Sequence, residues 1–296
     1  MSDNIPGRWP LSDPDPAAPT AIENSVHSPM RKPALNRGAA LQKEIGETVV
    51  PFGQAAIWWL GQATFCFKLG QSLIYTDPFY RAEDQEPPTP LQELPLKPGE
   101  FTGASLICCT HEHLDHIDPL TLPGAAAASP QASVIIPEST RDLVLGMNVP
   151  AERLVTMRGD DKIERGAITI HAIPAAHMTL DKNAHGYRYL GYMIQGNGVT
   201  LYHPGDTQPY PGWAARVSKF EIDIAFLPIS GVDNLHWQQA IYFCANHQPR
   251  LAIPMHYGLF PKYTQDPLVF ANGLSNNVPD QKIKIMQVGE KFIYQR

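Results

Sequence analysis

The chain has 296 residues, of which 43% are hydrophobic and 18% are charged, so it has the composition of an ordinary globular protein with one large domain or two small ones. Its formal net charge of −6 argues against a protein that binds nucleic acid or an anionic membrane through a basic surface. We therefore expect no nucleic-acid partner.

The N-terminal sequence MSDNIPGRWPLSDPDP lacks the apolar core of a signal peptide. No apolar run approaches the roughly 20 residues that span a bilayer. The four cysteines form no C-x-x-C pair, and Cys108 and Cys109 are expected to be small buried hydrophobes in a strand. These features predict a soluble, cytoplasmic protein without a membrane span, in a reducing compartment.

Residues 1–36 are rich in Pro, Ser, Asp and Asn, which predicts an extended or partly disordered N-terminal arm. The remainder, residues 37–296, is expected to form one domain that begins with a short helix over residues 37–47. Two apolar, β-prone runs follow on either side of Gly70 and predict a hairpin of buried strands over residues 55–80. Five prolines then indicate a loop over residues 81–103.

Strands and helices alternate along the rest of the chain. We expect helices over residues 138–148 and 236–247. The expected strands and hairpins cover residues 104–110, 132–137, 152–157, 162–177, 191–206, 222–230, 250–258 and 282–294. This order predicts an α/β fold, namely an αββα sandwich in which helices cover two mixed β-sheets.

The stretch LICCTHEHLDHIDPL, residues 106–120, carries an H-x-H-x-D-H array directly after an apolar strand. His111 and His113 project to one side of an extended segment and can chelate one ion. If the chain then turns, Asp115 and His116 can face a second ion about 3.5–4 Å away, as in two-metal hydrolytic sites. Three further candidate ligands also follow apolar strands, where loops deliver side chains to one edge of an α/β fold: His177, Asp206 and His256.

These motifs resemble those of the metallo-β-lactamase superfamily. The resemblance rests on THEHLDH, a distant histidine, HPGDT and IPMHYG, and it extends over nearly the whole chain from residue 37. AAIWWLGQATFCFKLG, LYHPGDTQPY, LAIPMHYGLFPKYTQDP and QVGEKF are most similar to the L-ascorbate-6-phosphate lactonase-like branch. WLGQATF, TDPFY and PAAH are similar to the N-acyl-phosphatidylethanolamine phospholipase D type.

The resemblance implies a dinuclear centre and assigns its ligands. The first ion would be held by His111, His113 and His177, the second by Asp115, His116 and His256, with Asp206 as the bridge. Asp77, in the YTDP motif, would not bind metal itself but would hold the metal ligands in place. Two divalent ions are implied, with zinc expected and manganese or iron as alternatives.

The mechanism that follows is hydrolysis by a metal-activated hydroxide, with Asp115 and Asp206 as the catalytic carboxylates. The expected substrate is a small lactone or ester, which could carry a phosphate. His177 stands where the lactonase branch has a carboxylate, and this departure argues against strict specificity for ascorbate 6-phosphate. The alternatives are hydrolysis of a phosphodiester, as by a phospholipase D, and a non-hydrolytic or oxygen-reactive metal protein on the same fold.

Four residues outside the ligand set are candidates for substrate contact: His185, Arg188, Tyr210 and Tyr257. His185 lies in a loop rich in Gly and Tyr, and Arg188 is the only arginine between His177 and Asp206, so it is a candidate for an anion contact. Ordinary packing or solvation explains each of them equally well. Whether the protein forms a homo-oligomer is left open by the sequence.

Overall fold

The computed structural model describes residues 32–81 and 91–296. Most of the predicted N-terminal arm, residues 1–31, lies outside the described residues. Its last residues lie along the domain, because Lys32 forms a β-bridge with Gln92 and the backbone N–H of Leu35 donates to the carbonyl of Val288.

The described strands form two large mixed sheets. The first has the order β15-β1-β2-β3-β4-β5-β6, in which β3 to β6 run parallel and the other pairs are antiparallel. Its strands are β1 (Gln54–Gly61), β2 (Thr64–Leu69), β3 (Ser72–Thr76), β4 (Leu106–Cys108), β5 (Ser133–Pro137), β6 (Leu154–Met157) and β15 (Lys291–Gln295). The predicted hairpin over residues 55–80 is wrong in one respect, because residues 62–63 turn the chain and make a three-stranded meander.

The second sheet has the order β14-β13-β12-β11-β8-β7, with parallel pairing of β12, β13 and β14. Its strands are β7 (Lys162–Arg165), β8 (Ile168–Pro174), β11 (Leu190–Gly196), β12 (Val199–His203), β13 (Ile224–Pro228) and β14 (Leu251–Met255). The strands β9 (Lys182–Asn183) and β10 (Gly186–Tyr187) form a separate two-stranded hairpin that is paired with neither large sheet.

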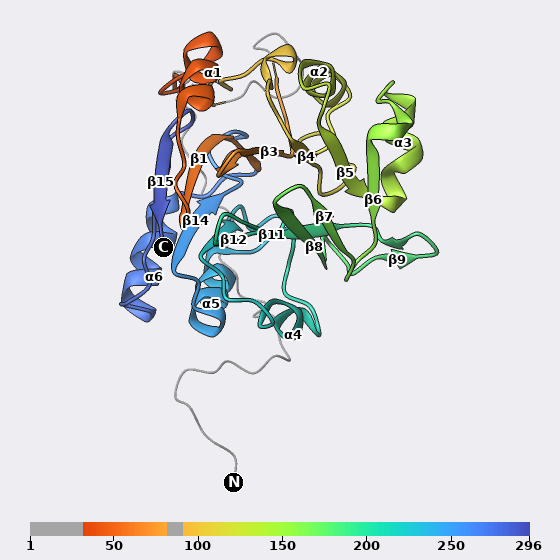
Figure 1. Ribbon diagram of the computed structural model, residues 1–296. Coiled ribbons are helices and arrows are strands. Elements are labelled where there is room, and N and C mark those ends of the chain that lie inside the picture. The colour runs from red at the N-terminus through yellow and green to blue at the C-terminus, as the bar shows by residue number, and fades with distance from the viewer. Residues whose placement is uncertain (1–31, 82–90) are drawn as a thin grey trace. The chain divides into compact units, whose positions relative to one another are not determined.

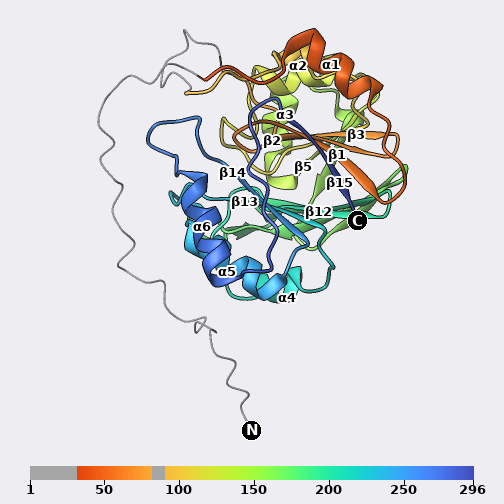
Figure 2. The same cartoon turned by 90° about the vertical axis from the view of Figure 1, so that its left-hand side faces the viewer.

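Helices cover the outer faces of the two sheets (Figures 1 and 2). The helices α1 (Gly38–Glu47), α2 (Thr121–Ala128) and α3 (Arg141–Gly146) pack on the first sheet. The second sheet is covered by α4 (Trp213–Val217), α5 (Trp237–His247) and α6 (Pro267–Asn277). Short 3₁₀ turns are η1 (Pro98–Glu100), η2 (Glu138–Thr140) and η3 (Ala151–Arg153). The predicted αββα sandwich is confirmed.

The core follows from strict alternation along the buried strands. In β1, Ile57 and Trp59 face the second sheet, whereas Trp58 faces the helices α1 to α3. Between the sheets, the Phe65 and Phe226 rings pack with centroids 4.6 Å apart. Apolar side chains on both faces explain why these strands read as continuous hydrophobic runs.

Cys108 and Cys109 are fully buried, as expected, and point to opposite faces of the first sheet. Burial raises the pKa of both thiols, so neither is an ionised ligand or nucleophile. Within the described residues, no helix combines the length and hydropathy that crossing a membrane requires.

Candidate metal centre

The structure brings all seven predicted ligand side chains together. Three overlapping groups have ligand atoms within 4.8 Å of one another. We call the first the three-histidine group (His111, His113 and His177) and the second the carboxylate group (Asp115, His116 and His256). The third joins Asp206 to His111 and His116.

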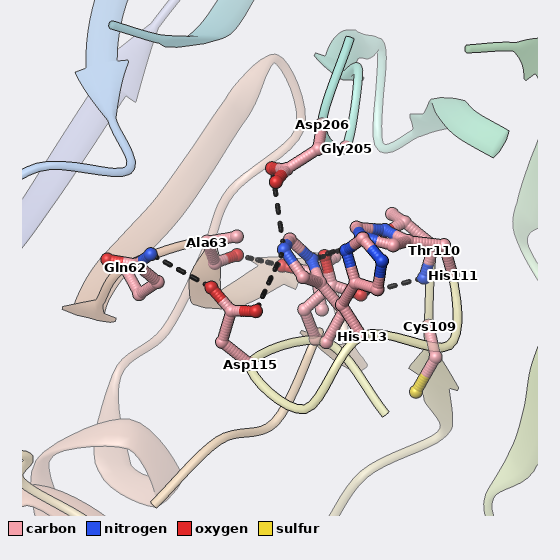
Figure 3. Close-up of polar contacts among 12 residues, drawn as sticks. Gln62, Ala63, Cys109, Thr110, His111, His113, Asp115, Gly205 and Asp206 are labelled. Atoms are coloured by element: carbon pink, nitrogen blue, oxygen red, sulfur yellow. Dashed lines mark hydrogen bonds and ion pairs between the residues drawn. The ribbon is translucent and has the colours of Figure 1, made fainter. Parts of the chain in front are cut away.

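Strand ends explain this convergence. The HxHxDH loop follows β4, His177 lies three residues beyond β8, and His256 immediately follows β14. Asp206 lies in the loop after β12. Figure 3 shows Asp115 and Asp206 reaching the histidines from different loops. The close approach of these loops requires Gly205, which has φ +64 and whose missing Cβ would lie 2.8 Å from the Leu190 carbonyl oxygen and 2.9 Å from Thr110 Cβ.

Asp206 contacts members of both groups. Its Oδ1 lies 3.4 Å from His116 Nε2, and its Oδ2 lies 3.2 Å from His256 Nε2 and 3.9 Å from His177 Nε2. A carboxylate in this position can contact two cations at once. Asp206 therefore contacts both the three-histidine group and the carboxylate group, as the bridging role implied by the resemblance requires.

A buried hydrogen-bond network orients the ligand histidines. Asp77 Oδ2 accepts from His116 Nδ1 at 2.8 Å and from the Thr110 hydroxyl at 2.9 Å. The same hydroxyl lies 3.1 Å from His111 Nδ1 and is free to accept its proton. His177 Nδ1 donates to the carbonyl of Asp233. These bonds hold the Nδ1 atoms of His111, His116 and His177 away from the centre and turn the Nε2 atoms of all three rings towards it.

The unsatisfied polar atoms fit a cation. Among the described residues, His111 Nε2, His116 Nε2 and Asp206 Oδ1 are buried and have no hydrogen-bond partner. Buried polar atoms are normally satisfied by a partner, and these two imidazole nitrogens and one carboxylate oxygen lie within 4.8 Å of one another. Imidazole nitrogen and carboxylate oxygen are the donor set of zinc, iron and manganese sites. The residues present therefore fit divalent metal binding.

Without metal, the two groups differ in protonation. Burial lowers the pKa of His111 and of His113, so these two rings of the three-histidine group are neutral near pH 7. Burial alone would lower the pKa of His256, but Asp206 and Asp115 beside it raise it to about 9. The same carboxylates, with Asp77, raise the pKa of His116. The two cationic histidines hold the pKa of Asp115 and of Asp206 well below the ordinary value, although burial acts the other way.

Gln62 belongs to the site, although the sequence analysis did not single it out. It lies in the turn between β1 and β2, and its Nε2 donates to Asp115 Oδ2 at 2.9 Å and lies 3.0 Å from His256 Nε2. The backbone carbonyl of Gln62 accepts from the His256 backbone N–H at 3.1 Å. Figure 3 shows Gln62 bonded to Asp115. Its signal in the sequence was an amide inside the otherwise apolar run IWWLGQATF.

Three residues of this site have left-handed backbones although none is glycine. They are Gln62 with φ 52, Asp77 with φ 42 and His256 with φ 59. Such conformations cost of order 1 kcal/mol or more each and persist where the surrounding structure enforces them, often at functional sites. This clustering of left-handed backbones does not depend on which side chains could bind metal, yet it marks the same site.

A cavity of about 270 Å³ opens onto the centre. His113, Asp115, His177, Asp206 and His256 line it with Gln62. The other described lining residues are Phe79, Arg81, Leu114, Val232, Asp233, Phe260 and Tyr263. These five proposed ligands are therefore accessible to a small molecule.

The four predicted substrate contacts are not among these lining residues. Tyr257 is buried, packs on Trp59 with ring centroids 4.9 Å apart and donates to the Met286 carbonyl. The Tyr210 hydroxyl donates to the carbonyl of Pro174. Both tyrosines are thus occupied in packing, and the geometry gives their predicted role no support.

The remaining two predicted contacts lie further out on the surface. His185 is exposed in the β9–β10 turn, 3.7 Å from Glu138. Arg188 pairs with Glu112 and with Asp181 and stacks over Tyr189, whose ring borders the three-histidine group. Arg188 therefore supports the HxHxDH loop from outside, and neither residue faces the cavity.

His203 also has a supporting place near the centre. It is buried, its Nε2 donates to the carbonyl of Ala63 at 2.9 Å, and its Nδ1 accepts from the N–H of Gly205. His203 therefore ties the Asp206 loop to the turn that carries Gln62.

Comparison with known proteins agrees with this geometry. The sequence model of the Beta-lactamase superfamily domain matches residues 56–256. A UPF0173 metal-dependent hydrolase of Pyrococcus furiosus is 28% identical over 80% of this chain and 98% of its own, and one of Caldivirga maquilingensis is 26% identical over 78% and 95%. The solved structure of Igni18, a metallo hydrolase from Ignicoccus hospitalis, is 20% identical, has a TM-score of 0.65, and matches 82% of this chain and 99% of its own. With the αββα fold, the convergent ligand set and a family match over most of its length, this chain belongs to the metallo-β-lactamase superfamily.

Proposed function

We propose that this protein is a metal-dependent hydrolase with two divalent ions, zinc by expectation, that acts on a small ester or lactone. The observation that carries the proposal is the position of Asp206, whose two oxygens contact members of both ligand groups at the floor of an open cavity. The names of the curated relatives support a metal-dependent hydrolase.

Bound divalent ions would lower the pKa of a shared water and stabilise the oxyanion of the transition state. Asp115 is the carboxylate placed to accept and return the proton. Gln62 donates a hydrogen bond to its Oδ2, and Asp115 lines the cavity. It would accept the proton of the attacking water and return it to the leaving alkoxide as the ester C–O bond breaks. Asp77 would keep His116 in the tautomer that offers Nε2 to a cation.

Metal-stripped and metal-reloaded protein would test the proposal on phenyl acetate, γ-butyrolactone and bis(4-nitrophenyl) phosphate, with zinc and with manganese. We expect ester and lactone hydrolysis only after reloading, with two ions per chain. His111→Ala should lose metal and turnover together. Full turnover by the stripped protein would contradict the metal mechanism, and cleavage of the phosphodiester alone would contradict the ester assignment.

Phosphodiester hydrolysis is the second candidate. The Arg81 guanidinium lines the same cavity and would suit a phosphate. The ester is favoured because, apart from the proposed ligands and Gln62, five of the seven described lining residues are apolar or aromatic and the volume of about 270 Å³ is small.

A further inference from the structure

Besides the proposed metal ligands, a set of apolar side chains lines the cavity. Five of the described lining residues are apolar or aromatic: Phe79, Leu114, Val232, Phe260 and Tyr263. Three of them are exposed, with Leu114 at 58%, Tyr263 at 45% and Val232 at 42% relative accessibility. Single exposed hydrophobic side chains are common on proteins, but three that share one cavity form a binding wall.

This wall is built by loops that carry the ligands or hydrogen-bond to them. Leu114 lies between His113 and Asp115, and Val232 precedes Asp233, whose carbonyl accepts from His177. The loop after His256 supplies Phe260, which packs against Phe79 with ring centroids 6.1 Å apart. A molecule that reaches the centre therefore contacts apolar surface as it does so.

Arg81 adds one cationic side chain to this apolar wall. It follows Asp77 by four residues, and its guanidinium carbon lies 5.8 Å from the centroid of the Phe79 ring. Among the described lining residues it is the only lysine or arginine. A guanidinium stacked beside an aromatic ring offers a carboxylate two parallel donors in a fixed plane.

Resting on the proposed function, we infer that the preferred substrate is a small ester or lactone with an apolar, ring-sized body and an anionic group remote from the bond that is cleaved. The apolar body lies against the wall of Phe79, Val232 and Phe260, and the anion pairs with Arg81. A volume of about 270 Å³ suits one small ring with short substituents. A polyhydroxylated sugar lactone is disfavoured, because its hydroxyl groups would face side chains that cannot bond them.

The test uses zinc-loaded protein and two esters that differ by one carboxylate, phenyl acetate and 3-acetoxybenzoate. Arg81→Gln should raise KM for 3-acetoxybenzoate about tenfold, while KM for phenyl acetate and both kcat values change less than about twofold. Arg141→Gln is the matched control, because Arg141 is an exposed arginine on α3 that is not among the lining residues. Equal effects of Arg81→Gln on the two esters would overturn the anion subsite.

The apolar wall is tested separately with Val232→Ser. Its control is Val269→Ser on α6, since Val269 is 39% exposed and also outside the cavity lining. We expect Val232→Ser to raise KM for both esters about fivefold and Val269→Ser to leave KM unchanged. No difference between the two serine variants would overturn the wall.

Binding of the products, phenol and 3-hydroxybenzoate, measured by calorimetry on the same zinc-loaded variants, separates the two levels of inference. If none of the esters is hydrolysed, the proposed function fails, yet the subsite is still judged by binding. Weaker binding of 3-hydroxybenzoate to Arg81→Gln, with phenol unaffected, would support it. Equal binding of 3-hydroxybenzoate by wild type and variant would contradict it.

Discussion

The two ligand groups lie side by side and differ in charge. The three-histidine group has rings whose pKa values are lowered by burial at His111 and His113, so it meets a cation with free lone pairs. The carboxylate group holds His116 and His256 with raised pKa values, so near neutral pH each must release a proton before it can bind metal. Metal binding at the carboxylate group is therefore coupled to release of these two protons, whereas His111 and His113 of the three-histidine group can bind a cation without releasing one.

This difference explains how the metal-free fold tolerates two carboxylates at the centre, the buried Asp206 and the partly exposed Asp115. Asp206 and Asp115 are compensated by the protonated imidazoles of His116 and His256, with contacts of 3.2 to 3.7 Å. Buried charges persist in proteins when they are paired in this way. Metal ions would replace those two protons with larger charges on the same ligands, so the site can be assembled before metal arrives.

Asp206→Ala should have the largest effect on metal binding and turnover, because the Asp206 carboxylate contacts both ligand groups. We expect both ions to bind more weakly and turnover to fall about a thousandfold or more, since the transition-state stabilisation by a metal pair is worth several kcal/mol. Metal content per chain and ester hydrolysis would be measured on the same sample. Retention of two tightly bound ions would show that Asp206 is not a bridge.

The pH dependence of stability should separate metal-free from metal-loaded protein. A histidine with a raised pKa stabilises the fold fully below its unfolded pKa of about 6.5, and this contribution is lost as pH rises through the folded value. For His256, with a folded pKa of about 9, the loss between pH 6.5 and 9 is on the order of 3 kcal/mol. Urea unfolding with a chelator present would measure it.

The zinc-loaded protein should show no such loss, because its ligand histidines are already neutral. His256→Gln should reduce the slope in metal-free protein. A metal-free stability that stays level or rises between pH 6.5 and 9 would contradict the assignment of protonated histidines to the carboxylate group.

Asp77→Asn should weaken the carboxylate group more than the three-histidine group, since Asp77 accepts the Nδ1 proton of His116. Loss of such a partner typically costs about 10–100-fold in metal affinity. Asp118→Asn is the control, because Asp118 accepts from Leu120 N and the Thr121 hydroxyl at the start of α2. Competition with a zinc chelator would give both affinities, and equal effects of the two variants would count against the special role of Asp77.

The sequence predicted the sandwich and the ligand cluster well because both depend on strands. Continuous apolar runs identify doubly covered strands, and each ligand follows such a run at a strand end. The turn at residues 62–63 was missed because Gly61 was taken as part of a longer strand. Helix α6 was also missed, since Gly273 weakens its helical pattern. That glycine is required by packing, as its missing Cβ would lie 2.7 Å from Ile241 Cδ1 on α5.

The cavity wall could not be predicted, because it depends on how four loops meet in space. Arg81 and Val232 carry no local pattern that marks them as lining residues. The substrate candidates chosen from sequence, such as Tyr257 and Tyr210, were aromatic or polar neighbours of ligands, and their hydroxyl groups are instead satisfied by backbone carbonyls. Adjacency in sequence to a ligand therefore says little about which way a side chain faces.

Gln62→Met offers the smallest and most selective perturbation of the carboxylate group. Methionine keeps the length and burial of the side chain but removes the N–H that donates to Asp115 Oδ2. A lost hydrogen bond to a charged group is worth about 1.5 kcal/mol, so we expect kcat to fall about tenfold with little change in zinc content. Gln54→Met is the matched control, because the side-chain amide of Gln54 donates to Gln295 Oε1 at the start of β1, away from the ligand groups. If Gln62→Met lost zinc instead of kcat, Gln62 would be holding the ligands in place rather than orienting Asp115 for proton transfer.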